Sequence, residues 1–105
     1  MRGIRVIAEE LVTVGGGGGG ADILFSAKAG NRILIIMQSP SRSMEPYGYL
    51  TSPNGEGAYT PENKLAAHGE NSSEVTLSQD GDYTLTVFDG ANEGGEVHVR
   101  IELLE

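Results

Sequence analysis

Two stretches near the C-terminus decide the fold class: GDYTLTVF at residues 81–88 and EVHVRIEL at residues 96–103. In both, every second residue is apolar: tyrosine, leucine and valine in the first stretch, and valine, isoleucine and leucine in the second. Successive side chains of a β-strand point to opposite faces of a sheet, so this period predicts two strands with one apolar face each. The connection, residues 89–95, is rich in glycine and contains asparagine. Both residue types tolerate positive φ, so we expect this connection to form a hairpin.

Similar patterns recur upstream. Residues 32–38 are apolar at successive positions and include three isoleucines, which favours a strand at the centre of a sheet or one covered on both faces. Shorter runs bounded by turn residues predict strands at 22–27, 47–51 and 74–77. The sequence therefore predicts an all-β protein, an antiparallel β-sandwich or jelly roll of seven or eight strands.

The N-terminal segment is set apart by six consecutive glycines at residues 15–20. Within the segment 1–14, the pattern at residues 4–14 predicts one or two strands, although residues 7–11 could equally begin a helical turn. A phosphate-binding loop would end in Gly-Lys-Ser/Thr before a helix, whereas Ala21, Asp22 and a strand follow here. We interpret the glycines as a natural or engineered linker to a sandwich body at 21–105 within one domain. Because six residues reach about 20 Å, the N-terminal strand can pair with its own body or exchange with a neighbour.

Composition and charge exclude several classes of function. The chain has 105 residues, 38% of them hydrophobic, which suffices for one small core. Seven basic and fifteen acidic residues give a net charge of −8, and the excess of acids lies from Leu65 onward. This balance disfavours a nucleic-acid partner. The absence of cysteine excludes disulfides, thiolate metal sites and cysteine nucleophiles.

The sequence contains no candidate membrane helix. The longest apolar run, residues 33–37, is far shorter than the roughly 20 residues that a membrane helix needs, so we expect no membrane insertion. Glu9 and Glu10 stand where a signal peptide would continue its apolar stretch. The residues alone leave the localisation open between a cytoplasmic protein and a domain of a longer exported one.

Acidic residues on two successive turns are candidates for a calcium site. Calcium takes carboxylate and carbonyl oxygens as ligands, and adjacent carboxylates repel one another unless a cation screens them. The candidate ligands are Asp80 and Asp82 on one turn and Asp89, Asn92 and Glu93 on the next. Plain turns and a solubilising acidic surface are the alternative interpretation. No cofactor is required by the sequence, and calcium is the candidate ion.

Three tyrosines are candidates for a binding surface. Tyr47, Tyr49 and Tyr59 lie around two loops rich in glycine and proline. Exposed tyrosines offer a large contact area at a low entropic cost. Because a strand over 47–51 must bury one face, Tyr47 or Tyr49 could instead belong to the core.

The sequence indicates no catalytic residues. His68 lies in a long unassigned segment, residues 55–73, in which residues 65–67 could form a helical turn or a short edge strand. His98 is expected on the solvent side of its strand. Neither histidine has the spacing of a zinc site or the setting of a Gly-x-Ser-x-Gly nucleophile. We therefore expect a protein that is not an enzyme.

From Asp22 to Leu103 the chain resembles the bacterial pre-peptidase C-terminal domain family. The resemblance is carried by Phe25–Ile33 with its Ala-Gly turn, by Tyr47–Gly55 ending in Leu-x-x-Pro-x-Gly, by the Gly-x-Tyr-x-Leu-x-Val pattern at 81–87 and by the closing strand Val97–Ile101. The Gly-x-Tyr pattern is also typical of a tyrosine corner, in which the ring packs while the hydroxyl reaches a backbone group.

The resemblance implies an accessory β-sandwich appended to secreted peptidases, and hence an extracellular or periplasmic location. Our first hypothesis is a non-enzymatic accessory or binding module for a protein or an extracellular polymer, with calcium as a candidate stabiliser. The alternative is a structural or self-assembling subunit whose N-terminal strand pairs with a neighbour. The chain would then be either a monomer or a strand-exchanged oligomer.

Overall fold

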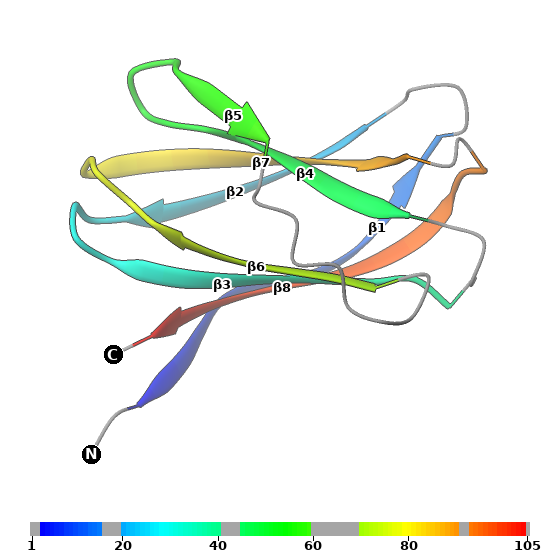
Figure 1. Ribbon diagram of the computed structural model, residues 1–105, viewed down its shortest axis with the longest axis horizontal. Coiled ribbons are helices and arrows are strands. Elements are labelled where there is room, and N and C mark those ends of the chain that lie inside the picture. The colour runs from blue at the N-terminus through cyan, green and yellow to red at the C-terminus, as the bar shows by residue number, and fades with distance from the viewer. Residues whose placement is uncertain (1–2, 16–19, 41–44, 60–69, 91–92, 105) are drawn as a thin grey trace.

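The computed structural model describes residues 3–15, 20–40, 45–59, 70–90 and 93–104, which form a two-layer β-sandwich (Figure 1). Within these ranges the backbone forms eight strands and no helix. The strands are β1 (Ile4–Val14), β2 (Ala21–Ala27), β3 (Arg32–Gln38), β4 (Pro46–Thr51), β5 (Gly57–Tyr59), β6 (Glu70–Thr76), β7 (Gly81–Asp89) and β8 (Gly95–Leu104). The expected all-β fold is confirmed. The described residues accordingly include no helix of the length and hydrophobicity needed to cross a membrane.

The strands form two antiparallel sheets of four strands among the described residues. Sheet A has the order β1-β8-β3-β6, and sheet B has the order β2-β7-β4-β5. Consecutive strands alternate between the two sheets except for β4 and β5, which are neighbours in sheet B. The first strand thereby pairs with the last. This is the jelly-roll arrangement that the sequence predicted as one of two forms.

The expected hairpin between residues 81–88 and 96–103 is wrong. β7 lies in sheet B between β2 and β4, whereas β8 lies in sheet A between β1 and β3. The glycine-rich connection therefore crosses from one layer to the other. An alternating pattern determines which face of a strand is buried, but it carries no information about the strand's hydrogen-bonding partner.

The core lies between the two sheets. Val97, Val99 and Ile101 of β8 are fully buried, and so are alternate residues of β3 and β7. The Phe25 ring stacks on the Tyr83 ring, with centroids 5.6 Å apart. β3 lies inside sheet A, as its apolar sequence predicted. The buried apolar side chains are Val14, Ile23, Phe25, Ile33, Ile35, Met37, Leu50, Leu77, Tyr83, Leu85, Val87, Val97, Val99, Ile101 and Leu103.

Two segments differ from the sequence-based expectations. Residues 4–14 form a single strand with a bulge between Val6 and Ala8, so the helical turn considered for residues 7–11 is wrong. The segment 55–73, left unassigned by the sequence, contains β5 and the start of β6. Both are edge strands, and neither carries an alternating apolar pattern that would reveal it. Residues 65–67 and His68 lie outside the described residues.

Candidate binding faces

The tyrosines of β4 lie on the outer face of sheet B. Along β4, Pro46, Gly48 and Leu50 are buried against the core, whereas Tyr47 and Tyr49 are half-buried on the opposite side. Neither tyrosine therefore belongs to the core, which was the other interpretation of this strand. β5 places the Tyr59 backbone opposite Tyr49, and the side chain of Tyr59 lies outside the described part of the structure.

Three aromatic rings gather on this face, and we call Tyr47, Tyr49 and Phe88 the aromatic patch. The rings of Tyr47 and Phe88 are stacked, with centroids 5.3 Å apart and planes inclined by 23°. The Tyr49 ring lies directly over Gly57, where an added Cβ would fall 2.8 Å from the Tyr49 Cζ atom. Glycine at this position thus allows the ring to lie against the backbone of β5.

Polar and apolar side chains of β2 and β7 lie on the same outer face of sheet B as the aromatic patch. The Thr86 hydroxyl donates a 2.7 Å hydrogen bond to Asp22, and the Ser26 hydroxyl donates a 2.6 Å bond to Asp82. Leu24, between Asp22 and Ser26, is 69% exposed. The face therefore combines flat apolar rings with acidic and hydroxyl groups. Such a surface can bind a partner by contact and hydrogen bonding.

At one end of β7, the two candidate calcium ligands of the first turn accept hydrogen bonds from protein groups. Asp80 accepts a 2.7 Å bond from the Ala29 amide, and Asp82 accepts the bond from Ser26. Both bonds tie the start of β7 to the end of β2 and the turn that follows it. The carboxylates have a structural role at this corner, whether or not an ion also binds there.

At the other end of β7, the carboxylate of Asp89 is 4% exposed and is surrounded by backbone amides. Its Oδ1 atom accepts a bond from the Glu45 amide at 3.0 Å. Its Oδ2 atom accepts bonds from the amides of Glu93 and Gly94 at 2.7 and 2.9 Å. Hydrogen bonds to a charged acceptor are stronger than neutral ones. Asp89 therefore links the residue just before β4 to the residues just before β8.

The candidate calcium ligands are divided between the two ends of β7. Nine residues of strand, Gly81–Asp89, place these ends about 27 Å apart at the usual rise per residue. Asn92 lies outside the described residues. Within the described ranges, no three His, Cys, Asp or Glu side chains lie close enough together to hold a metal ion. A calcium ion at either turn stays a prediction.

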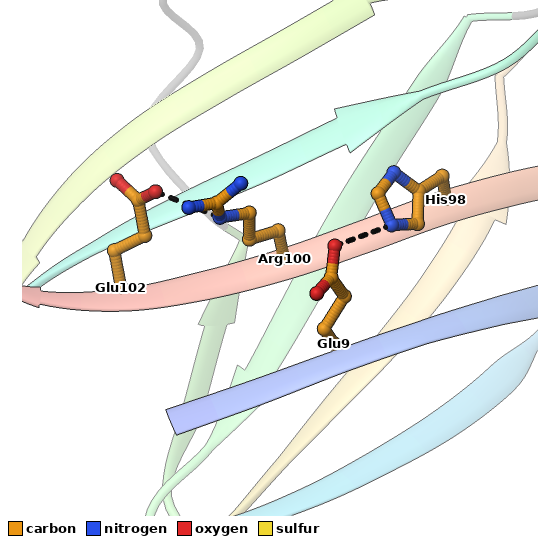
Figure 2. Close-up of polar contacts among 4 residues, drawn as sticks. All are labelled: Glu9, His98, Arg100 and Glu102. Carbon is orange, nitrogen blue, oxygen red and sulfur yellow. Dashed lines mark hydrogen bonds and ion pairs between the residues drawn. The ribbon is translucent and has the colours of Figure 1, made fainter. Parts of the chain in front are cut away.

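Figure 2 shows two of the polar pairs on the outer face of sheet A, neither of which the sequence revealed. His98 Nε2 lies 2.9 Å from Glu9 Oε2, and the two side chains are 43% and 46% exposed. Arg100 Nε lies 2.8 Å from Glu102 Oε2, and Glu102 is only 8% exposed. The solvent-side position expected for His98 is confirmed. Its partner lies 89 residues earlier in the chain, and only the pairing of β1 with β8 brings the two together.

Exposed apolar side chains on this face come mainly from β1. Ile4, Val6 and Leu11 are exposed, and Leu11 keeps 63% of its surface. Leu34 and Ile36 of β3 are half-buried on the same outer face. The outer face of sheet A thus mixes apolar side chains with polar pairs.

No protein-family model matches the chain, and no curated protein matches its sequence. Among solved structures, the fold is similar to the crystal structure of Aeromonas hydrophila PliG, described as a periplasmic lysozyme inhibitor of g-type lysozyme. The TM-score is 0.57 and the sequence identity is 17%, and the match covers 99% of this chain and 86% of that one. A likeness at this identity establishes a shared β fold and nothing further.

Proposed function

We propose that this chain is a non-enzymatic binding module that recognises a protein partner through the aromatic patch. The observation that carries the proposal is the stacking of Tyr47 on Phe88, beside Tyr49, on the outer face of a four-stranded sheet. Tyrosine is enriched among the residues that contribute most to binding energy. The rings are held by stacking and by close backbone contact, so binding would cost little additional side-chain entropy.

The charge of the chain suggests the chemistry of the partner. The net charge is −8, and Asp22 and Asp82 lie on the same face as the patch. Complementary potentials steer association and suppress partners of like charge. A partner with a basic surface fits this face best.

The structural comparison supports a protein as the partner and an extracellular or periplasmic location. The similar structure is that of a periplasmic protein that inhibits a g-type lysozyme. A g-type lysozyme is therefore the first probe to test. The resemblance to pre-peptidase C-terminal domains instead suggests an accessory role beside a secreted peptidase. In that case the partner is a peptidase domain or an extracellular polymer.

The decisive experiment measures binding of g-type lysozyme by calorimetry, together with lysozyme activity at increasing concentrations of the chain. Phe88→Ser and Tyr47→Ser should each weaken binding about tenfold or more, as expected for the centre of an interface. Leu11→Ser, on the outer face of sheet A, is the matched control and should leave the affinity unchanged. Equal affinities in folded patch variants and wild type would contradict a role for the patch.

A second experiment distinguishes a protein partner from a polymer partner. Co-sedimentation with insoluble peptidoglycan that is lost in the same patch variants would show that the aromatic patch binds a polymer instead of a protein.

Calcium stabilisation is tested separately, by thermal unfolding with calcium and with chelator. Asp80→Asn and Asp89→Asn should abolish any calcium-dependent shift that arises at their respective turns.

A further inference from the structure

The N-terminal strand β1 is attached to the sandwich in an unusual way. It is the edge strand of sheet A, and its backbone pairs only with β8 among the described strands. At its C-terminal end the chain continues into the six glycines of residues 15–20. Glycine places few restrictions on the path of a chain, and six residues reach about 20 Å.

The side chains of β1 are far more exposed than those of the other long strands. Among its eleven residues only Val14 is fully buried. Ile7, Ala8 and Val12 are partly buried against the core. Detaching β1 therefore uncovers less apolar surface than detaching an interior strand such as β3 would. β1 is correspondingly easier to release than the interior strands of sheet A.

The neighbouring strand β8, in contrast, needs a partner on this edge. Val97, Val99 and Ile101 are buried in the core, so β8 stays in place when β1 leaves. In the structure, β1 pairs with β8 from Leu104 to Gly95. Once β1 detaches, the full length of β8 is therefore unpaired on that side. An open row of backbone donors and acceptors is a template for another strand.

Direct pairing of two β1 edges is opposed by the sequence of β1. Glu9 and Glu10 lie at the middle of the strand, so a symmetric antiparallel pair would bring like charges together. Glu10 also shares the core-facing side with Val99, its register partner, and the bulge at Ile7 interrupts the edge. Inward-pointing charges and bulges both discourage the addition of a strand to an edge.

We propose that β1 is an exchangeable strand: β8 of one copy accepts β1 of a second copy in the register it uses for its own. Exchange recreates every β1–β8 contact, including the hydrogen bond between Glu9 and His98, and requires no new interface. The occupant of the β8 edge is thus a second copy of this chain. The proposal does not depend on the aromatic patch, which lies on the other sheet.

The test places single cysteines on two different copies of the full chain. One copy carries Thr13→Cys and the other carries Glu96→Cys, and the two positions face each other across β1 and β8. The chain has no cysteine of its own. Side chains in directly opposite positions lie about 5 Å apart at Cβ, close to the spacing of a disulfide. A covalent heterodimer therefore reports β1 of one copy on β8 of the other.

Two controls make the result unambiguous. The double variant T13C/E96C in one chain must form an internal disulfide, which shows that the two thiols are within reach. If it does not, the neighbouring facing pair Leu11→Cys and His98→Cys replaces it. The matched control mixes Thr13→Cys with Thr76→Cys, an exposed position on β6 at the opposite edge of sheet A.

The expected result is that heterodimers of Thr13→Cys with Glu96→Cys form several-fold faster than those with Thr76→Cys, and more so at higher protein concentration. Isotope labelling of one copy allows mass spectrometry to distinguish heterodimers from homodimers. Equal yields for the two pairs would show that β1 remains on its own chain, and the proposal would be wrong. Predominance of homodimers through Cys at position 13 would indicate edge-to-edge pairing and would equally refute exchange.

Discussion

The hydroxyl of Tyr83 donates a hydrogen bond of 2.8 Å to the carbonyl oxygen of Gln79 and accepts one of 3.1 Å from the amide of the same residue. The Tyr83 ring is almost fully buried and stacks on Phe25. One side chain therefore fixes the turn before β7 and contributes to the core. This geometry is a tyrosine corner, which the Gly-x-Tyr pattern at residues 81–83 predicted.

Removing this hydroxyl should destabilise the protein without changing its fold. We expect Tyr83→Phe to lower the free energy of unfolding by about 1–2 kcal/mol, because two hydrogen bonds to one backbone position are lost. Urea denaturation should show a lower midpoint with an unchanged m-value. Thr84→Val removes a hydroxyl from the next residue, on the outer face, and should change stability by less than about 0.5 kcal/mol. Equal losses for both variants would contradict the corner's role.

Strand existence could be predicted from the sequence, whereas strand partners could not. The alternation in β7 and β8 showed which side chains are buried, because burial follows a period of two. It suggested a hairpin, yet the two strands lie in different sheets. The pairing of the first strand with the last depends on contacts between residues about 90 positions apart, such as Glu9 with His98. Such contacts leave no trace in local periodicity.

Gly81 should be harder to replace than Gly30, although both have a positive φ. Its φ of 131° lies in a region that other residues rarely adopt, and an added Cβ would fall 3.0 Å from the Pro53 side chain. We expect Gly81→Ala to cost about 2–3 kcal/mol of stability. Gly30→Ala is the matched control, because Gly30 also has a positive φ of 87° but nothing lies within 4 Å of its added Cβ. It should cost only about 1 kcal/mol.

Thermal and urea unfolding of both variants would test this difference. A cost at Gly30 that equals the cost at Gly81 would show that backbone conformation alone decides both sites. In that case the contact with Pro53 would contribute nothing measurable.

The pair formed by Arg100 and Glu102 should matter more than a surface ion pair. Glu102 is 8% exposed, so removing Arg100 leaves a shielded carboxylate without its countercharge. We expect Arg100→Met to destabilise the protein by about 1–3 kcal/mol. Arg32 pairs with Glu74 at 3.3 Å, with both side chains nearly half exposed, so Arg32→Met should cost less than about 1 kcal/mol.

The salt dependence of stability gives a second measurement of the difference between the Arg100–Glu102 and Arg32–Glu74 pairs. Screening weakens an exposed pair more than a shielded one, so added salt should reduce the effect of Arg32→Met more than that of Arg100→Met. An Arg100→Met variant as stable as wild type would contradict the assigned role of the pair.

The candidate binding face was only partly predictable. The sequence singled out Tyr47 and Tyr49, but their side of the sheet depended on whether β4 buries its odd or its even positions. Burial of Pro46, Gly48 and Leu50 decides this, and neither proline nor glycine is a strong signal of a core position. Phe88 could not be assigned to this group from the sequence, because the pairing of β4 with β7 that brings it to Tyr47 is not local.

Local sequence was equally unable to separate the roles of the acidic residues. Asp80 and Asp89 look alike in sequence, each followed by glycine, yet Asp80 accepts one backbone hydrogen bond in the described structure and Asp89 accepts three. Asp89→Asn turns one acceptor oxygen into a donor that faces backbone amides. We expect a loss of about 1–3 kcal/mol, with faster amide exchange at Glu45, Glu93 and Gly94. Asp80→Asn should cost about 1 kcal/mol or less and leave those amides protected. Unchanged exchange at all three amides in Asp89→Asn would show that the carboxylate does not hold these segments together.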